Sequence, residues 1–143
     1  MKRNLFAYGT LMCEDILSAV AGCAPASAAA VLKDYRRLKV RGEQYPGLIH
    51  HPGGWVEGLL YRDIKPAAWA RLDRFEGAMY ERVSVVVEFD DVTLVQADTY
   101  LIRPESEHRL EPVEWDFEGF LAHGKDGFVR DYAGYESVRT QSD

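Results

Sequence analysis

Hydrophobic and polar residues change their spacing several times along the chain, and each change predicts an element of secondary structure. Residues 4–8 form a short apolar and aromatic run, which is typical of a buried strand. From Cys13 the apolar residues recur as on one face of a helix, two acids stand in its first turn, and Gly22 offers an end to it. The N-terminal segment therefore predicts a strand, a loop and a helix.

The loop between this strand and this helix carries candidate chemistry. Gly9 allows another group to approach the main chain closely. The N–H groups of an opening helical turn lack acceptors within the helix, so they can bind a carboxylate or a developing oxyanion. The candidate binding residues in this loop are Tyr8, Gly9, Thr10 and Leu11.

Alternating apolar and polar residues predict strands in the middle of the chain. Residues 31–40 predict one or two strands around a turn at Lys33-Asp34. Residues 48–50 and 55–64 predict a hairpin whose turn is His51-Pro52-Gly53-Gly54. We therefore expect a hairpin in this part of the chain.

The segment Lys65 to Gly77 is the clearest helix in the sequence. Pro66 suits its first turn, and Gly77 suits the left-handed residue that ends many helices. Trp69 and Glu76 are separated by seven positions, so at about 100° per residue they project within about 20° of each other. Glu76 therefore lies on the apolar face.

A carboxyl group on an apolar face has chemical consequences. Burial and the negative end of the helix dipole both disfavour the charged form, so both raise the pKa of Glu76. Such a group can accept and return a proton near neutral pH. The alternative is structural, since Glu76 could cap backbone groups or reach water beyond the helix end.

The C-terminal part of the sequence predicts two more strands followed by helical turns. Residues 80–89 and 92–102 alternate as antiparallel partners around Asp90-Asp91, and the charged run after Pro104 is expected to end the sheet. Aromatic residues between positions 115 and 132 predict helical turns that pack on the sheet. Residues 136–143 are expected to form a flexible tail.

Composition and charge exclude several functional classes. The 143 residues suit one domain, and 47% apolar with 28% charged residues excludes a disordered chain. A net charge of −6 argues against nucleic acid as a partner, and the basic run 36–41 is interpreted as a strand with one solvated face. No apolar run is long enough for a membrane span and no signal peptide is recognised, so a cytoplasmic protein is expected.

Histidine and cysteine residues offer little further chemistry. The adjacent His50 and His51 point to opposite faces of a strand and lack a third ligand, so neither a metal nor a cofactor is expected. Cys13 and Cys23 form no CxxC motif, which agrees with a reduced compartment. Cys13 stands at a helix start but has no identifiable base, so it is a weak candidate nucleophile.

Three stretches resemble motifs of the gamma-glutamylcyclotransferase-like (AIG2-like) family. Tyr8-Gly9-Thr10-Leu11 is similar to the YGTL/YGSN loop that opens the family, and residues 72–77, LDRFEG, are similar to its LDxxEG helix end. Tyr45-Pro46-Gly47 resembles a turn that is common in bacterial members. The motifs occur in the family's order, and the resemblance covers roughly residues 3–102.

The resemblance implies a fold, an activity and a site. The fold would be a single α+β domain over residues 1–135, with a mixed barrel-like β-sheet flanked by helices. The enzyme would be an acyltransferase-type cyclotransferase that converts a small gamma-glutamyl amide into 5-oxoproline and a free amine without metal or cofactor. Glu76 would be its catalytic acid/base. The implied substrate-binding residues are Tyr8, Gly9, Thr10, Leu11, Tyr45 and Tyr80.

Other interpretations remain open from the sequence. A domain of this fold could act on a different amide, or could bind a small molecule without turnover. Tyr8, Tyr45 and Tyr80 could each be a core aromatic residue instead of a substrate contact. The leaving amine is not identified, and a monomer or a weak homodimer is expected.

Overall fold

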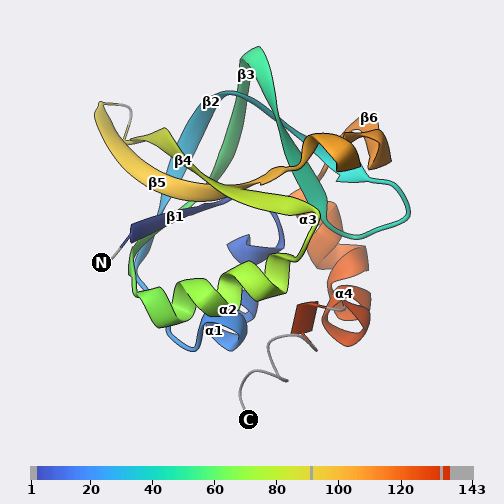
Figure 1. The fold of residues 1–143 in the computed structure, drawn as a ribbon, viewed down its shortest axis with the longest axis horizontal. Coiled ribbons are helices and arrows are strands. Elements are labelled where there is room, and N and C mark those ends of the chain that lie inside the picture. Colours follow the sequence, from blue (N-terminus) through green and yellow to red (C-terminus); the bar gives the residue numbers. More distant parts are fainter. Residues whose placement is uncertain (1–2, 91, 133, 136–143) are drawn as a thin grey trace.

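Figure 1 presents a computed structural model of the chain, which describes residues 3–90, 92–132 and 134–135. The strands are β1 (Arg3–Ala7), β2 (Ser27–Val40), β3 (Pro46–Ile64), β4 (Tyr80–Phe89), β5 (Thr93–Ile102) and β6 (Leu110–Glu114). They form one sheet in the order β3-β1-β5-β4-β2-β6, and β3 also pairs with β2, which closes β1 to β5 into a barrel-like sheet. The pairing of β1 with β5 is parallel and the others are antiparallel, so the sheet is mixed, as predicted.

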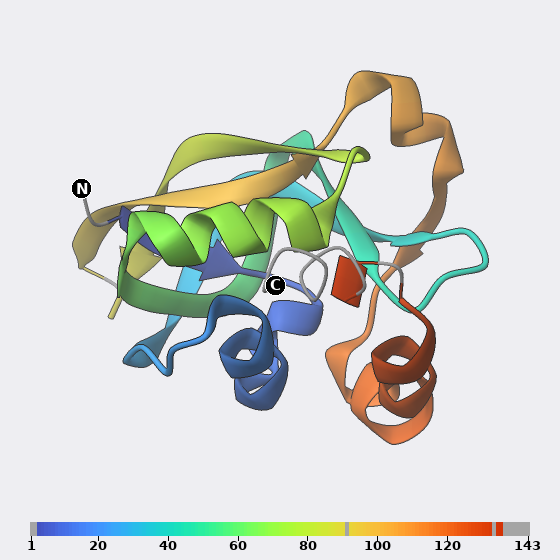
Figure 2. The same ribbon diagram turned by 60° about the horizontal axis from the view of Figure 1, so that its bottom comes forward.

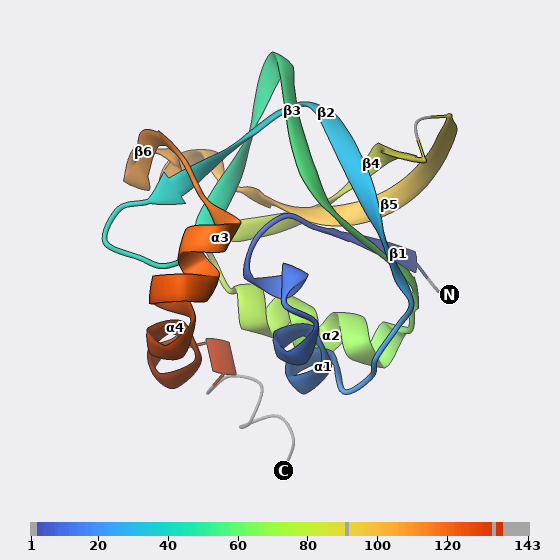
Figure 3. The ribbon, with the colours of Figure 1, turned by 180° about the vertical axis from the view of Figure 1, so that it is seen from behind.

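Helices cover one side of this sheet. The α-helices are α1 (Glu14–Ala21), α2 (Pro66–Glu76), α3 (Phe117–Gly119) and α4 (Lys125–Asp131), the 3₁₀ turns are η1 (Thr10–Met12) and η2 (Pro104–Arg109), and the π-turn is η3 (Phe120–Gly124). Figure 2 shows α2 lying along the sheet with α1 beneath it, while α3 and α4 lie to the side. The view from behind in Figure 3 gives the same arrangement. No helix of the described residues is both long and apolar enough to cross a membrane.

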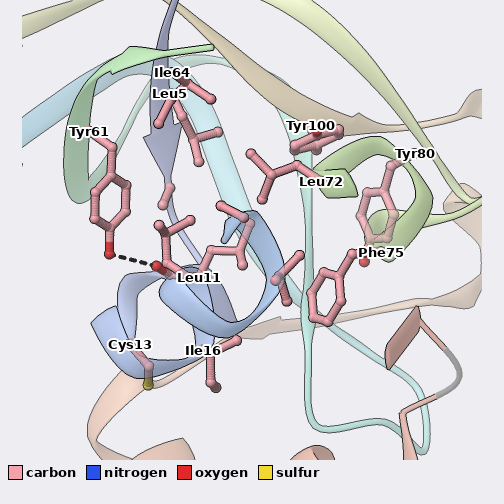
Figure 4. Close-up of a cluster of buried hydrophobic side chains, with 14 of the residues drawn as sticks. Leu5, Leu11, Cys13, Ile16, Tyr61, Ile64, Leu72, Phe75, Tyr80 and Tyr100 are labelled. Carbon is pink, nitrogen blue, oxygen red and sulfur yellow. Dashed lines mark hydrogen bonds between the residues drawn. The ribbon is translucent and has the colours of Figure 1, made fainter. Parts of the chain in front are cut away.

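The apolar side chains form two clusters because successive strand residues point to opposite faces of the sheet. In β1, Leu5 and Ala7 join the larger cluster, which packs the helices against the sheet, whereas Phe6 joins the smaller one on the other face. Figure 4 shows part of the larger cluster, in which Leu72 and Phe75 of α2 are fully buried. This cluster fixes the end of α2 beside the end of β1.

The predicted hairpin within residues 48–64 is wrong. Both of its segments belong to the one strand β3, and both pair with β2 instead of with each other. The Pro-Gly-Gly segment forms a bulge in β3, since the register shifts between Lys33 opposite Trp55 and Tyr35 opposite His50. Its proline is tolerated because this part of β3 has β2 on one side and no strand pairing on the other among the described residues. The turn expected at residues 33–34 is likewise a bulge within the continuous strand β2.

Other boundaries agree better with the sequence. α2 begins at Pro66 and ends at Glu76, as expected. The left-handed helical conformation expected for Gly77 is wrong, because its φ of 83° and ψ of −167° lie in a different region that is open essentially only to glycine. The expectation that the sheet ends after Pro104 is wrong, because β6 pairs with β2. The predicted strands 80–89 and 92–102 correspond to β4 and β5. Asp91 of the predicted turn and the predicted tail 136–143 lie outside the described residues.

Candidate active site

A small cavity lies where the end of β1, the end of α2 and the starts of β3 and β4 meet. Its volume is about 20 Å³, close to the room that one water molecule needs. Its lining residues are Leu5, Phe6, Ala7, Tyr8, Gly9, Thr10, Leu11, Tyr45, Pro46, Glu76, Tyr80 and Tyr100. All of the site residues proposed from the sequence are among them, so the fold brings them together from four separate segments.

The loop after β1 passes close to the start of β3. A Cβ atom added to Gly9 would lie 2.9 Å from Cγ of Pro46, which is too close for an unstrained contact. Gly9 therefore lets the loop approach Tyr45-Pro46-Gly47 closely. This approach joins two of the three motifs recognised in the sequence. The turn expected at these three residues is wrong, because Pro46 and Gly47 are the first residues of β3 and pair with β2.

All four carbonyl groups of residues 8–11 accept hydrogen bonds. Nη1 of Arg37 donates to the Tyr8 carbonyl at 2.9 Å, and the hydroxyl of Tyr61 donates to the Leu11 carbonyl at 2.8 Å (Figure 4). The two carbonyls between them accept the main-chain N–H groups of Met12 and Cys13 at 3.0 and 3.1 Å. The loop is thus held through its oxygens.

The N–H groups of the same loop have no such partners. Within the described part of the chain, the amides of Gly9, Thr10 and Leu11 donate no hydrogen bond. The structure contains no cis peptide bond among the described residues, and in a trans peptide the N–H points away from the C=O. The loop therefore presents a row of unpaired donors beside the cavity, which is an arrangement that binds anions.

Glu76 is the last residue of α2 and lines the same cavity. The residue keeps some solvent exposure overall, but burial of its carboxyl group raises the pKa to about 8, and the negative charge of Asp73 adds to the shift. Within the described ranges the carboxyl group accepts no hydrogen bond from a backbone N–H, so it does not cap the helix end. Its oxygens are free to accept a proton from a bound molecule.

The predicted tyrosines combine packing with cavity lining. The hydroxyl of Tyr8 donates to the Tyr100 carbonyl at 2.6 Å, and that of Tyr80 donates to the Pro46 carbonyl at 2.6 Å. Burial raises the pKa of both Tyr8 and Tyr80 well above the ordinary value, so both hydroxyls stay protonated. The hydroxyl of Tyr45 lies 3.9 Å from the sulfur of a methionine, and this side chain keeps partial exposure at the rim.

Several residues around the site escaped sequence reasoning. The hydroxyl of Tyr100 donates to Oδ1 of Asp73 at 2.7 Å, and its ring lines the cavity. The hydroxyl of Tyr132 donates to the carbonyls of Phe75 and Glu76 at 2.8 and 3.1 Å, which joins the C-terminal helical segment to the end of α2. Both tyrosines lie in segments whose secondary structure was predicted. No pattern in the sequence, however, indicates that they contact the end of α2, because these partners are distant along the chain.

Other candidate groups lie apart from this chemistry. No group of three or more His, Cys, Asp or Glu side chains among the described residues could hold a metal ion. The ring of His50 packs edge-on against Tyr35 with centroids 5.3 Å apart, and neither residue lines the cavity. Burial raises the pKa of the Cys13 thiol, which opposes formation of a nucleophilic thiolate.

Comparison with known proteins agrees with the motifs and the fold. AIG2-like protein C of Arabidopsis thaliana is 31% identical over 127 residues, which cover 88% of this chain and 73% of that protein. A solution structure of an Arabidopsis thaliana protein matches with a TM-score of 0.72 and 29% identity over 91% of this chain and 79% of that chain.

A solved structure named gamma-glutamyl cyclotransferase shares the fold, with a TM-score of 0.67 and 17% identity over 97% of this chain and 87% of that one. The family model described as "Gamma-glutamyl cyclotransferase, AIG2-like" matches residues 5–117, which include the cavity-lining loop and the end of α2. The chain therefore belongs to the gamma-glutamyl cyclotransferase, AIG2-like family.

Proposed function

We propose that this protein is a gamma-glutamyl cyclotransferase that releases 5-oxoproline and a free amine from a small gamma-glutamyl amide. One observation carries the proposal: a carboxyl group with a pKa raised to about 8 shares a cavity with three consecutive unpaired backbone N–H groups. Family membership supports it, since relatives with this fold include a protein named gamma-glutamyl cyclotransferase.

The first step is a proton transfer to Glu76. The substrate carries an α-ammonium group. Its pKa is somewhat above the value of about 8 for a peptide N-terminus, because a carboxylate stands beside it, and it is therefore comparable with the raised pKa of Glu76. Because the two pKa values are similar, the proton moves between the groups at little cost in free energy. The neutral amine can then attack the γ-carbonyl carbon of the same molecule, so ring closure requires no nucleophile from the protein.

The second step is collapse of the tetrahedral intermediate. The amide N–H groups of Gly9, Thr10 and Leu11 stabilise the oxyanion or hold the substrate carboxylate, and each such donor can contribute about 3 kcal/mol. Protonated Glu76 returns its proton to the nitrogen of the departing amine as the C–N bond breaks. The attacking nitrogen still carries one hydrogen more than the lactam keeps, and this proton passes through the Glu76 carboxylate to the released amine, which leaves as an ammonium ion. The products are 5-oxoproline and the free amine, and Glu76 is again a carboxylate.

A glutamyl group needs more room than the cavity of about 20 Å³ provides. We therefore expect side chains at the rim to move when substrate binds. Tyr45 is the rim residue with partial exposure, and its ring meets that of Tyr132 edge-on with centroids 5.3 Å apart. Movement of these two rings would open the cavity from the side of the C-terminal helical segment.

A different amide reaction has less support from this site. Glu76 is the only carboxylate or basic side chain among the described residues that line the cavity. A reaction that needs a second acid or base would therefore lack that group here. Intramolecular cyclisation needs a single group that first accepts and then donates a proton.

The test is release of 5-oxoproline from γ-glutamyl amino acids, γ-glutamyl-ε-lysine and glutathione, measured by chromatography. We expect release by the wild type and none by Glu76→Gln, which keeps the shape of the side chain but cannot carry the proton. Glu81→Gln is the matched control, because Glu81 is exposed on β4 and outside the cavity lining. Full activity of Glu76→Gln, or no release from any substrate by folded wild type, would contradict the proposal.

A further inference from the structure

Arg37 approaches the loop after β1 from β2, and it belongs to the basic run 36–41 that was expected to be a strand with one solvated face. Its side chain is only 13% exposed. Nη1 donates to the Tyr8 carbonyl at 2.9 Å and to the Glu57 carbonyl at 3.3 Å, so it joins the loop after β1 to β3. Arg37 does not line the cavity itself, and it lies on the side of the loop where the carbonyl points.

Two further contacts fix the guanidinium group. Nη2 lies 3.4 Å from Oε1 of Glu114 in β6, and the guanidinium carbon lies 5.4 Å from the centroid of the Trp115 ring. A planar guanidinium with several directed contacts loses little further freedom when it makes one more hydrogen bond. The strand that the sequence did not predict therefore helps to hold the arginine under the loop.

The contact with the Tyr8 carbonyl determines where the next N–H points. The peptide between Tyr8 and Gly9 is planar and trans, so a carbonyl directed at Arg37 directs the Gly9 N–H to the opposite side. A charged donor on the carbonyl also polarises the peptide and makes its N–H a stronger donor. The positive charge of Arg37 also acts on the cavity lining. It lowers the pKa of the Tyr8 phenol, although burial raises that pKa by more.

The Tyr8 carbonyl is a special case among the four loop carbonyls. Those of Gly9 and Thr10 are bonded by main-chain N–H groups of the following turn, and that of Leu11 accepts a neutral tyrosine hydroxyl. Of these four carbonyls, only that of Tyr8 accepts a hydrogen bond from a charged side chain of the described residues.

We propose that Arg37 is a positioning residue of the active site: through the Tyr8 carbonyl it aims and strengthens the Gly9 N–H that binds the carboxylate or oxyanion of the substrate. The kinetic consequence rests on the proposed cyclotransferase function. The effect on the loop and on anion binding does not depend on turnover.

The test compares Arg37→Met, Arg37→Lys and Arg36→Met. Methionine keeps an unbranched stem without donors, whereas lysine keeps the charge and can restore one hydrogen bond. Arg36 is the matched control, because it is the neighbouring arginine of β2 and its side chain makes no hydrogen bond or ion pair with the described residues. Thermal unfolding identifies any variant that fails to fold.

We expect kcat/KM for 5-oxoproline release to fall by about 10- to 100-fold in Arg37→Met, the range expected when one oxyanion donor is misplaced. Arg37→Lys should recover part of this loss, and Arg36→Met should stay within about twofold of the wild type. Wild-type kinetics in folded Arg37→Met would overturn the proposal. If Arg37→Met does not fold, Arg37→Lys decides, because a single ammonium nitrogen cannot replace the fork of the guanidinium and should still leave kcat/KM measurably below the wild type.

A second readout needs no activity. We expect the Tyr8 carbonyl ¹³C and Gly9 amide ¹H shifts in NMR spectra to change in Arg37→Met but not in Arg36→Met. Titration with 5-oxoproline, whose carboxylate probes the donors, should give weaker binding in Arg37→Met only. Unchanged shifts and unchanged 5-oxoproline affinity would overturn the role of Arg37. Failure of the proposed function would appear differently, as wild type that releases no 5-oxoproline from any substrate.

Discussion

Replacing Glu76 by glutamine should change how the stability of the protein depends on pH. The folded protein raises the pKa of this carboxyl group from 4.5 to about 8. Between these two pH values the unfolded chain releases a proton that the folded protein retains, so the free energy of unfolding falls as pH rises. Below pH 4.5 both states are protonated, and above pH 8 the full cost of the buried charge is present. Glutamine does not titrate, so the variant lacks this contribution.

The size of the effect follows from the pKa difference. One pKa unit corresponds to about 1.4 kcal/mol, so raising the pH from 5 to 8 should cost the wild type about 3 kcal/mol of stability relative to Glu76→Gln. This is a large part of the 5–15 kcal/mol that is typical of folded domains. The protein therefore accepts a measurable loss of stability at the pH where a carboxyl of this pKa is useful as an acid/base.

Urea unfolding at pH 5, 6, 7 and 8 measures this difference, with tryptophan fluorescence as the signal because Trp69 and Trp115 are buried. Subtracting the wild type from the variant removes titrations common to both, such as that of Asp15, whose pKa Lys125 lowers. The variant should gain about 3 kcal/mol on the wild type between pH 5 and 8. A difference that stays constant with pH would refute a buried, titrating Glu76.

Three further substitutions test the loop and its surroundings. Tyr61→Phe removes the donor to the Leu11 carbonyl and should lower the free energy of urea unfolding by about 1 kcal/mol; an unchanged midpoint would contradict this. Gly9→Ala places Cβ against Pro46 and should reduce 5-oxoproline release at least about tenfold in folded protein, whereas full activity would show that the loop adapts. Tyr132→Phe removes the hydrogen bonds from the Tyr132 hydroxyl to the end of α2, so amide hydrogen exchange within α4 should become faster. An unchanged exchange rate would show that packing alone holds α4 against α2.

The parts of the site that the sequence predicted are those set by local rules. The first motif contains its own strand end, glycine and helix start, and the second places Glu76 on the apolar face of a helix by periodicity alone. Both therefore appear in the structure where the spacing puts them. The resemblance added that the two belong to one site, a relation that neither spacing nor propensity contains.

The parts that the sequence did not predict depend on contacts between distant segments. The turn signals at His51–Gly54 are real, but a long partner strand converts them into a bulge. β6 is short and half polar, and it becomes a strand only because β2 offers an edge to it. Arg37 and Tyr132 contact the proposed site by donating hydrogen bonds to backbone carbonyls of other elements. Because every residue has a backbone carbonyl, the sequence does not indicate which one a side chain will bind.

The proposed acid and the proposed N–H donors are carried by different elements, and this determines how the site should respond to substitutions. Glu76 is fixed by α2, whose Leu72 and Phe75 are fully buried in the larger cluster, while the N–H groups follow β1 and the loop. Because a proton transfer requires the groups to approach to within hydrogen-bonding distance, a small shift of α2 against β1 disturbs the reaction more than it disturbs burial. Conservative core substitutions between α2 and β1 should therefore reduce activity before they reduce stability. Substitutions in the smaller cluster away from the cavity lining, such as at Leu32 or Val87, should do the reverse.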